Sequence, residues 1–261
     1  MLEVVQAILL GIVQGLTEFI PVSSSAHLII GEYLLNTDFT SLTYDVALHS
    51  GTLLALLVYF RWDLTRFARN AFTSGQDRRT MFHIIVASAP VAVAGFFLID
   101  IVETVFRSLW VIVVMLVLVA LVMLAADRWR GTRTVENMSF RDAFLIGIAQ
   151  AVALIPGTSR SGSTIAAGSL LGLNNAEAAR FSFYMGIPAI AGANLRTLSQ
   201  TGVLADIGAE WLVYLVGALV AAVIGYAAIG ILLWFLRGHS LAFFAWYRIV
   251  LALVLSVVLI T

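Results

Sequence analysis

Long apolar segments alternate with short polar loops along almost the whole chain. A membrane-spanning helix needs about 20 mostly apolar residues. Six segments meet or approach that length, covering about 44–60, 81–100, 108–126, 180–198, 211–236 and 241–260. Because a helix satisfies its own backbone polar groups inside lipid, the pattern predicts an all-α, polytopic membrane protein with these spanning helices.

Two further apolar regions are interrupted near their middle. Residues 2–35 are divided by Pro21 and the serines that follow it, and residues 141–173 are divided by Pro156 and a polar run. Each half has about 12–18 residues, which is too short to cross a bilayer comfortably. Irregular backbone is tolerated at membrane depth where it is buried in protein. We therefore predict two re-entrant helix–loop–helix hairpins in addition to the six spans.

The composition agrees with this prediction and excludes other classes of protein. Of the 261 residues, 61% are hydrophobic and 11% are charged, whereas soluble domains are about 45–50% apolar and about 25% charged. These values exclude a soluble globular enzyme and a disordered chain. Fifteen basic residues balance fifteen acidic ones, which leaves no basic surface for nucleic acid. Because the chain has no cysteine, disulfides and thiolate metal sites are also excluded.

The positions of the arginines predict how the chain lies in the membrane. The loops at 61–80 and 127–141 are rich in arginine, whereas those at 36–43, 101–107 and 199–210 contain Arg107 alone. Arginine-rich loops face the cytoplasm. The span 44–60 therefore runs inward, the first broken region enters from outside, and the second enters from the cytoplasm.

The two broken regions resemble each other in sequence. Residues 10–14 read LGIVQ and residues 19–25 read FIPVSSS, while residues 146–150 read IGIAQ and residues 154–160 read LIPGTSR. One gap aligns the two pairs, and three spans follow each region. Because three is odd, the halves have opposite orientation. We predict one membrane domain over 1–261, built from inverted repeats at about 1–126 and 140–261, with a polar site near the bilayer midplane.

The first break carries several residue types that suit chemistry on an anion. Gln14 and Glu18 share one helical face, and an ionisable residue inside an apolar segment is a functional candidate by default. Ser23–Ser25 suit the start of a helix, where free N–H groups bind anions. His27 follows one turn later and could transfer protons or act as a nucleophile.

The second break adds an obligate positive charge. Arg160 presents a planar fork that matches phosphate oxygens, and it is flanked by Ser159, Ser161, Gly162 and Thr164. A buried Arg160 needs a counter-charge, either Glu18 or an anionic ligand. If both breaks meet, a carboxylate beside a bound anion favours a divalent cation, Mg²⁺ or Ca²⁺, held by Glu18 with Gln14. Phosphoryl transfer to water fits this set of groups.

Two other polar residues lie inside the predicted spans. His49 could face a cavity or pack against other helices, and we favour packing. Arg248 lies about seven residues into the last span, from where its side chain could reach the interface by snorkelling.

The segment from Gln14 to His27, QGLTEFIPVSSSAH, resembles the first motif of the bacterial undecaprenyl-diphosphate phosphatases, the bacitracin-resistance family. The segment Pro156–Gly162, PGTSRSG, resembles the second motif, and the resemblance covers essentially the whole chain. It implies removal of the terminal phosphate from undecaprenyl diphosphate, which recycles the lipid carrier for cell-wall synthesis. It also implies a divalent cation, a multi-pass location in the bacterial inner membrane, and an active site open to the extracytoplasmic side. By this resemblance Glu18, His27 and Arg160 are catalytic, with Ser24 a further candidate.

We therefore expect a diphosphate lipid between the two breaks, with its isoprenoid tail leaving sideways among the spans into membrane lipid. The expected phosphate ligands, apart from Arg160, are Ser23, Ser25, Ser159, Ser161, Gly162 and Thr164. His27 is the base or the direct phosphoryl acceptor, with Ser24 the rival nucleophile. A lipid flippase or transporter is the alternative, since it can share the inverted-repeat architecture; a membrane scaffold is a weaker third reading. The choice of cation and the formation of a homodimer stay open.

Overall fold

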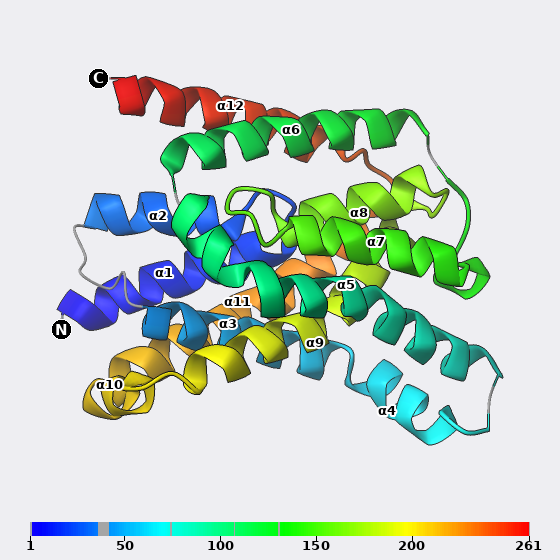
Figure 1. Cartoon of the computed structure of the whole chain (residues 1–261), viewed down its shortest axis with the longest axis horizontal. Coiled ribbons are helices and arrows are strands. Elements are labelled where there is room, and N and C mark those ends of the chain that lie inside the picture. The colour runs from blue at the N-terminus through cyan, green and yellow to red at the C-terminus, as the bar shows by residue number, and fades with distance from the viewer. Residues whose placement is uncertain (1, 36–41, 74, 107, 130, 261) are drawn as a thin grey trace.

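The computed structural model describes residues 2–35, 42–73, 75–106, 108–129 and 131–260. Within these ranges the protein is helical, and its only β-type pairing is an isolated bridge between Arg133 and Leu173. The helices are α1 (Leu2–Phe19), α2 (Ser24–Leu35), α3 (Leu42–Tyr59), α4 (Arg61–Asn70), α5 (Gly75–Val105), α6 (Leu109–Arg128), the 3₁₀ turn η1 (Val135–Asn137), α7 (Phe140–Val152), α8 (Arg160–Leu170), α9 (Asn175–Leu198), α10 (Val203–Ala209), α11 (Trp211–Leu236) and α12 (Ala242–Ile260) (Figure 1).

Within the described ranges, five helices are long and apolar enough to cross a membrane, namely α1, α5, α6, α11 and α12. The last four contain predicted spans. The helix α3 is apolar but shorter, over Tyr44–Tyr59. The first half of the broken region 2–35 forms one uninterrupted helix of 18 residues, which is the upper limit of the length expected for each half and is also long enough for a span.

The predicted span at 180–198 does not belong to this set of five. It lies in α9, which contains Pro188 and buries a continuous stretch from Phe181 to Gly186. Because these side chains contact other helices rather than lipid, α9 need not be apolar throughout. Phe183 of α9 packs edge-on against Phe19 of α1, with ring centroids 5.5 Å apart, in the main core beneath the chain breaks.

Two helical hairpins enter the bundle from opposite ends and turn near its middle (Figure 1). The helix α1 turns back into α2 within residues 20–23, and α7 turns back into α8 within residues 153–159. The helix α1 packs against α11, and α7 packs against α5. Both sequence breaks therefore lie in the interior of the protein.

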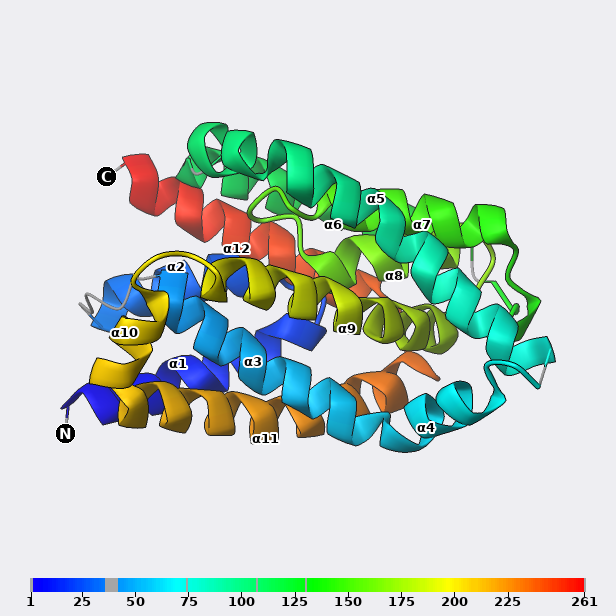
Figure 2. The ribbon, with the colours of Figure 1, turned by 60° about the horizontal axis from the view of Figure 1, so that its bottom comes forward.

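The arginine-rich segments lie together at the end of the bundle that is remote from both chain termini (Figure 2). Arg66 contacts Asp77 at 3.3 Å, and Arg180 contacts Asp63 at 3.2 Å. These ion pairs connect α4 to the starts of α5 and α9. The loops that we predict to share one side of the membrane thus share one end of the molecule.

Candidate active site

The two chain breaks have the same unusual backbone geometry. Ser23 (φ 77°) and Ser159 (φ 68°) are the non-glycine residues with positive φ in the described part of the chain. Each lies directly before the first residue of a helix, α2 or α8. A left-handed conformation costs an L-residue about 1–2 kcal/mol, and such strain concentrates at functional sites. The strain at matching positions marks both turns as candidate sites.

An ion pair joins the two hairpins. Arg160 Nη2 lies 3.1 Å from Glu18 Oε1, and the side chains are only 14% and 7% exposed. Arg160 Nη1 also donates to the backbone oxygen of Ser182 at 3.1 Å. Glu18 is thus the partner of Arg160 that the sequence analysis raised as one alternative. The contact brings together residues 142 positions apart, so the guanidinium and carboxylate have fixed positions relative to each other.

The second carboxylate oxygen of Glu18 contacts the other polar groups of the site. Ser24 Oγ donates to Glu18 Oε2 at 3.0 Å, and Gln14 Nε2 donates to the same oxygen at 3.2 Å. His49 Nε2 lies 3.7 Å from it. Glu18 therefore connects the guanidinium on one side with a hydroxyl and an imidazole on the other.

This cluster borders a cavity of about 290 Å³ between the two turns. Its polar lining includes Glu18, Ser23, Ser24, Ser25, His49, Gln150, Ser159 and Arg160. Its apolar lining comes mainly from α5, α9 and the turn after α7. A largely apolar pocket with a few convergent polar groups is the usual form of a small-molecule site.

The structure does not place His27 in this cavity lining. Its Nδ1 lies 2.8 Å from the backbone oxygen of Ser23, and its Nε2 lies 2.7 Å from Tyr247 Oη, with the two rings stacked. Sequence spacing suggested that His27 follows the serines into the site. It turns instead toward α12, because Tyr247 and the Ser23 carbonyl together hold both ring nitrogens.

His49 is the histidine that lines the cavity, contrary to our preference for simple packing. Its Nδ1 donates to the backbone oxygen of Asp45 at 2.7 Å, and its side chain is 33% exposed. A carbonyl oxygen can only accept, so the proton of neutral His49 lies on Nδ1 and Nε2 carries the free lone pair. The sequence showed only that a histidine lies within an apolar span. It did not show toward which neighbouring elements the side chain points.

Three of the predicted phosphate ligands, Ser161, Gly162 and Thr164, do not line the cavity. Thr164 Oγ1 donates to the Arg160 carbonyl at 2.7 Å, and Ser161 Oγ donates to the Ile20 carbonyl at 3.4 Å. The Gly162 N–H donates to Ser159 Oγ at 3.1 Å. These groups belong to the first turn of α8, whose orphan donors and hydroxyls bind within the protein. They hold the turn, and Ser159 and Arg160 reach the cavity.

The residues present suit a cation carried mainly by phosphate oxygens and water. The described residues contain no group of three His, Asp or Glu side chains that could form a metal cage. Gln14 Oε1 and both amide atoms of the buried Gln150 have no hydrogen-bond partner in the described part of the chain. Mg²⁺ typically uses one or two carboxylates together with substrate phosphates. Glu18 lines the cavity and fits that role, whereas Gln14 lies outside the lining and turns its amide N–H toward Glu18.

Arg248 holds the second turn, residues 153–159, in position through hydrogen bonds. It is fully buried, and its Nη2 donates to the carbonyl oxygens of Gly157 at 2.9 Å and Thr158 at 3.1 Å. It also donates to the carbonyls of Met115 and Leu116 on α6. The prediction that Arg248 snorkels to the interface is therefore wrong, because α12 packs against α6 and turns this side chain inward.

The Gly157→Ala variant is expected to lose about 2 kcal/mol of stability or more. Gly157 has φ +88°, and an added Cβ would lie 2.7 Å from the backbone of Ile112. Thermal unfolding in detergent would measure the loss. Gly95→Ala is the matched control, since a Cβ there meets nothing within 4 Å. Equal melting temperatures for both variants would contradict the close packing of this turn.

Comparisons with known proteins agree with the sequence resemblance. The family model described as "Bacitracin resistance protein BacA" matches residues 7–254. The undecaprenyl-diphosphatase of Rubrobacter xylanophilus is 48% identical over 272 residues, covering 99% of each chain. The undecaprenyl-diphosphatase of Idiomarina loihiensis is 42% identical over 262 residues, which cover 97% of this chain and 98% of the relative. The matches span nearly the full length of each protein, and the chain belongs to the bacitracin resistance protein BacA family.

Proposed function

We propose that this protein is an integral-membrane phosphatase that hydrolyses undecaprenyl diphosphate to undecaprenyl phosphate and inorganic phosphate. The full-length similarity to undecaprenyl-diphosphatases supports the substrate. The observation that carries the reaction is the convergence of Arg160, Glu18 and Ser24 on one cavity between two helix starts. This arrangement offers a fixed positive charge, a hydroxyl and a proton acceptor to a diphosphate.

The proposed architecture is an inverted repeat in the bacterial inner membrane. Two features support it: the strained serines lie at equivalent positions, and the packing of α1 on α11 corresponds to that of α7 on α5. In this arrangement the hairpins α1–α2 and α7–α8 are re-entrant, and α3 and α9 complete the spans. The cavity opens to the extracytoplasmic side, where the lipid product re-enters the carrier cycle.

The diphosphate would lie with its terminal phosphate between the turns. Arg160 and the first N–H groups of α2 would bind its oxygens. The apolar wall that Val91, Ala189 and Ala193 contribute from α5 and α9 would contact the first isoprene units. The tail would then pass sideways between helices into the lipid, since an apolar chain gains nothing from the polar end of the cavity.

The reaction would proceed by attack of Ser24 Oγ on the terminal phosphorus. The Oγ–P bond forms while the bond from phosphorus to the bridging oxygen breaks, and its electron pair leaves with undecaprenyl phosphate. The Ser24 proton passes along its hydrogen bond to Glu18 and on to His49 Nε2. Water then attacks the phosphoserine, phosphate departs, and Ser24 Oγ regains a proton. Arg160 stabilises the charge on the equatorial oxygens in both steps.

A divalent cation, Mg²⁺ or Ca²⁺, is part of the proposal. Glu18 would hold it beside the diphosphate, where it would neutralise part of the phosphate charge. Gln14 Oε1 would join it only after a turn of the amide, whose Nε2 faces Glu18. Glu18 would otherwise repel the substrate.

Phosphate release by the purified protein from undecaprenyl diphosphate tests the proposal. We expect release by the intact protein, its loss in Glu18→Gln, and a phosphoserine at position 24 that can be trapped by rapid acid quench. Arg141→Gln, an exposed change at the arginine-rich end, serves as the control. Lipid transport across a vesicle membrane without phosphate release would instead favour a flippase.

The His49→Gln variant is expected to lower kcat by about 10²-fold, because general-base catalysis contributes about 10²–10⁴-fold. The rate of phosphate release at saturating substrate measures this loss. His239→Gln, which follows the end of α11 and does not line the cavity, should leave kcat unchanged. If His27→Gln lowers kcat and His49→Gln does not, the proton acceptor is His27.

A further inference from the structure

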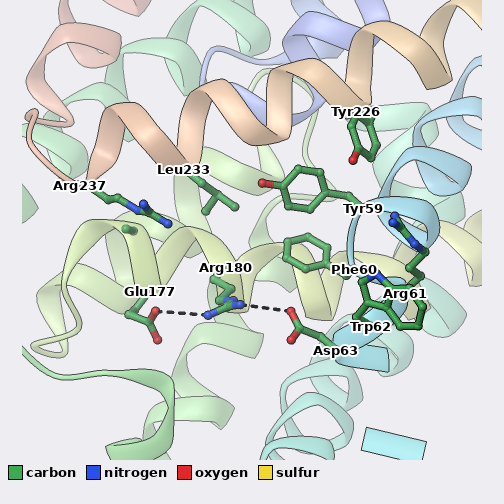
Figure 3. A pocket seen from close by; sticks show the side chains of 11 residues that line it. Tyr59, Phe60, Arg61, Trp62, Asp63, Glu177, Arg180, Tyr226, Leu233 and Arg237 are labelled. Atoms are coloured by element: carbon green, nitrogen blue, oxygen red, sulfur yellow. Dashed lines mark hydrogen bonds and ion pairs between the residues drawn. The ribbon is translucent and has the colours of Figure 1, made fainter. Parts of the chain in front are cut away.

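A second cavity lies at the arginine-rich end of the molecule. It has a volume of about 430 Å³ and lies between α4, the start of α9 and the end of α11 (Figure 3). This volume is within the range of small-ligand pockets, about 300–1,000 Å³. Three arginines and two carboxylates line it, so that the lining has a net charge of +1. The cavity therefore favours an anion.

The carboxylates of the lining are already engaged. Arg180 Nη2 lies 3.2 Å from Asp63 Oδ2, and its Nη1 lies 3.9 Å from Glu177 Oε1 (Figure 3). Asp63 also accepts from Tyr184 Oη at 2.8 Å, and Glu177 accepts from the Val135 N–H at 3.1 Å. Both carboxylates thus contact Arg180, and neither forms an ion pair with the other two arginines of the lining.

Those two arginines lie on different sides of the cavity. Arg61 donates to the carbonyl of Val58 at 2.9 Å and lies over the Trp62 ring at 5.2 Å, with no carboxylate among its partners in the described ranges. The backbone N–H of Arg237, at the end of α11, donates to the Trp234 carbonyl, but its guanidinium has no hydrogen bond or ion pair with any residue that the structure describes. Its guanidinium is directed into the space beneath α11 (Figure 3). Both charges are available to a ligand.

Two phenol groups add unused donors. The rings of Tyr59 and Tyr226 lie 5.2 Å apart. Neither hydroxyl has a hydrogen-bond partner within the part of the chain described, and the Tyr59 hydroxyl points toward the same space as Arg237 (Figure 3). The cavity thus offers guanidinium and phenol donors, while the carboxylates of its lining already have partners. These donors match a ligand group rich in hydrogen-bond acceptors, such as phosphate.

The surroundings of the cavity indicate a lipid as the source of this phosphate. Trp62 and Tyr226 are exposed aromatic residues of the kind that lie at the membrane–water interface. Beside the cavity, α11 exposes the apolar side chains Ile231 and Trp234. Basic pockets between membrane helices bind anionic head groups. We propose that this cavity binds the head group of a phospholipid with one net negative charge, whose acyl chains lie along the exposed face of α11.

Native mass spectrometry of the full-length protein tests this site. The probes are phosphatidylglycerol and phosphatidylcholine with identical acyl chains. The intact protein should retain phosphatidylglycerol preferentially. One arginine near an anionic lipid contributes about fivefold in affinity. Arg237→Gln should therefore lower phosphatidylglycerol retention about fivefold, and Arg61→Gln with Arg237→Gln about 25-fold, without changing phosphatidylcholine retention.

The control is Arg141→Gln, which removes the same charge from an exposed residue at the same end but outside the cavity. Equal losses in Arg141→Gln and Arg237→Gln, or equal retention of the two lipids by the intact protein, would overturn the proposal. A further arm adds inorganic phosphate at millimolar concentration. If phosphatidylglycerol stays bound in the presence of inorganic phosphate, the cavity is a lipid site. If inorganic phosphate displaces phosphatidylglycerol from the intact protein, the cavity selects free phosphate. Lipid retention is read without phosphatase turnover, so this result does not depend on the proposed reaction.

Discussion

The Arg160→Gln variant is expected to lower kcat for phosphate release by about 10³-fold. Removing one preorganised donor to a developing oxyanion costs about 10²–10³-fold, and Arg160 brings a full positive charge besides. Its guanidinium has a defined position because Glu18 and the Ser182 carbonyl each bind one nitrogen. The variant also leaves Glu18 buried without its counter-charge, so activity and folding have to be measured together.

The loss of stability and the loss of catalysis can be separated by a second change. Breaking a buried ion pair from one side costs about 3–5 kcal/mol. The double variant Arg160→Gln with Glu18→Gln removes both charges and should recover most of the melting temperature in detergent. It should recover none of the activity. Arg160→Lys keeps the charge but cannot bind Glu18 and Ser182 with one planar group, so an intermediate kcat is expected. An active double variant would show that Arg160 only supports the fold.

The spans and the breaks could be predicted from the sequence because each depends on local properties. Hydropathy located α5, α6, α11 and α12, and Pro21 and Pro156 marked the turns near which two hairpins reverse. Electrostatics suggested a counter-charge for a buried Arg160 but left Glu18 and an anionic ligand as alternatives. The structure shows that the partner is Glu18, whereas the buried Arg248 binds only backbone carbonyls.

Side-chain direction inside the bundle could not be predicted in the same way. His27 and His49 both lie on apolar helices, and the spacing of His27 from the serines favoured it. The structure reverses their positions because Tyr247, 220 residues away from His27, provides a partner on α12. Similarly, the burial of the Phe181–Gly186 stretch of α9 by protein was not visible in the sequence. Both outcomes depend on which helices pack together, and hydropathy contains no such information.

The Arg248→Met variant is expected to have the largest effect on stability. It leaves the carbonyls of Gly157 and Thr158 without the buried donor that binds them. A buried polar group without a partner costs about 1–3 kcal/mol. With both carbonyls affected, a loss of about 3–5 kcal/mol follows. We expect a large fall in the yield of monodisperse protein and in the melting temperature in detergent. Arg141→Met, an exposed change of the same kind, should leave both unchanged.

The conservative variant Arg248→Lys distinguishes support of the fold from positioning of the site. A lysine ammonium can bind some of these carbonyls but cannot bridge α6 and the turn as a planar fork does. The turn would keep its fold while its carbonyls shift, and with them the N–H of Gly157, which donates to Ser25 Oγ at 3.3 Å. Folded Arg248→Lys protein should therefore show a higher KM for the diphosphate lipid at nearly unchanged melting temperature. Unchanged KM and kcat in folded Arg248→Lys protein would confine Arg248 to stability, since the position of the turn would then not depend on the guanidinium.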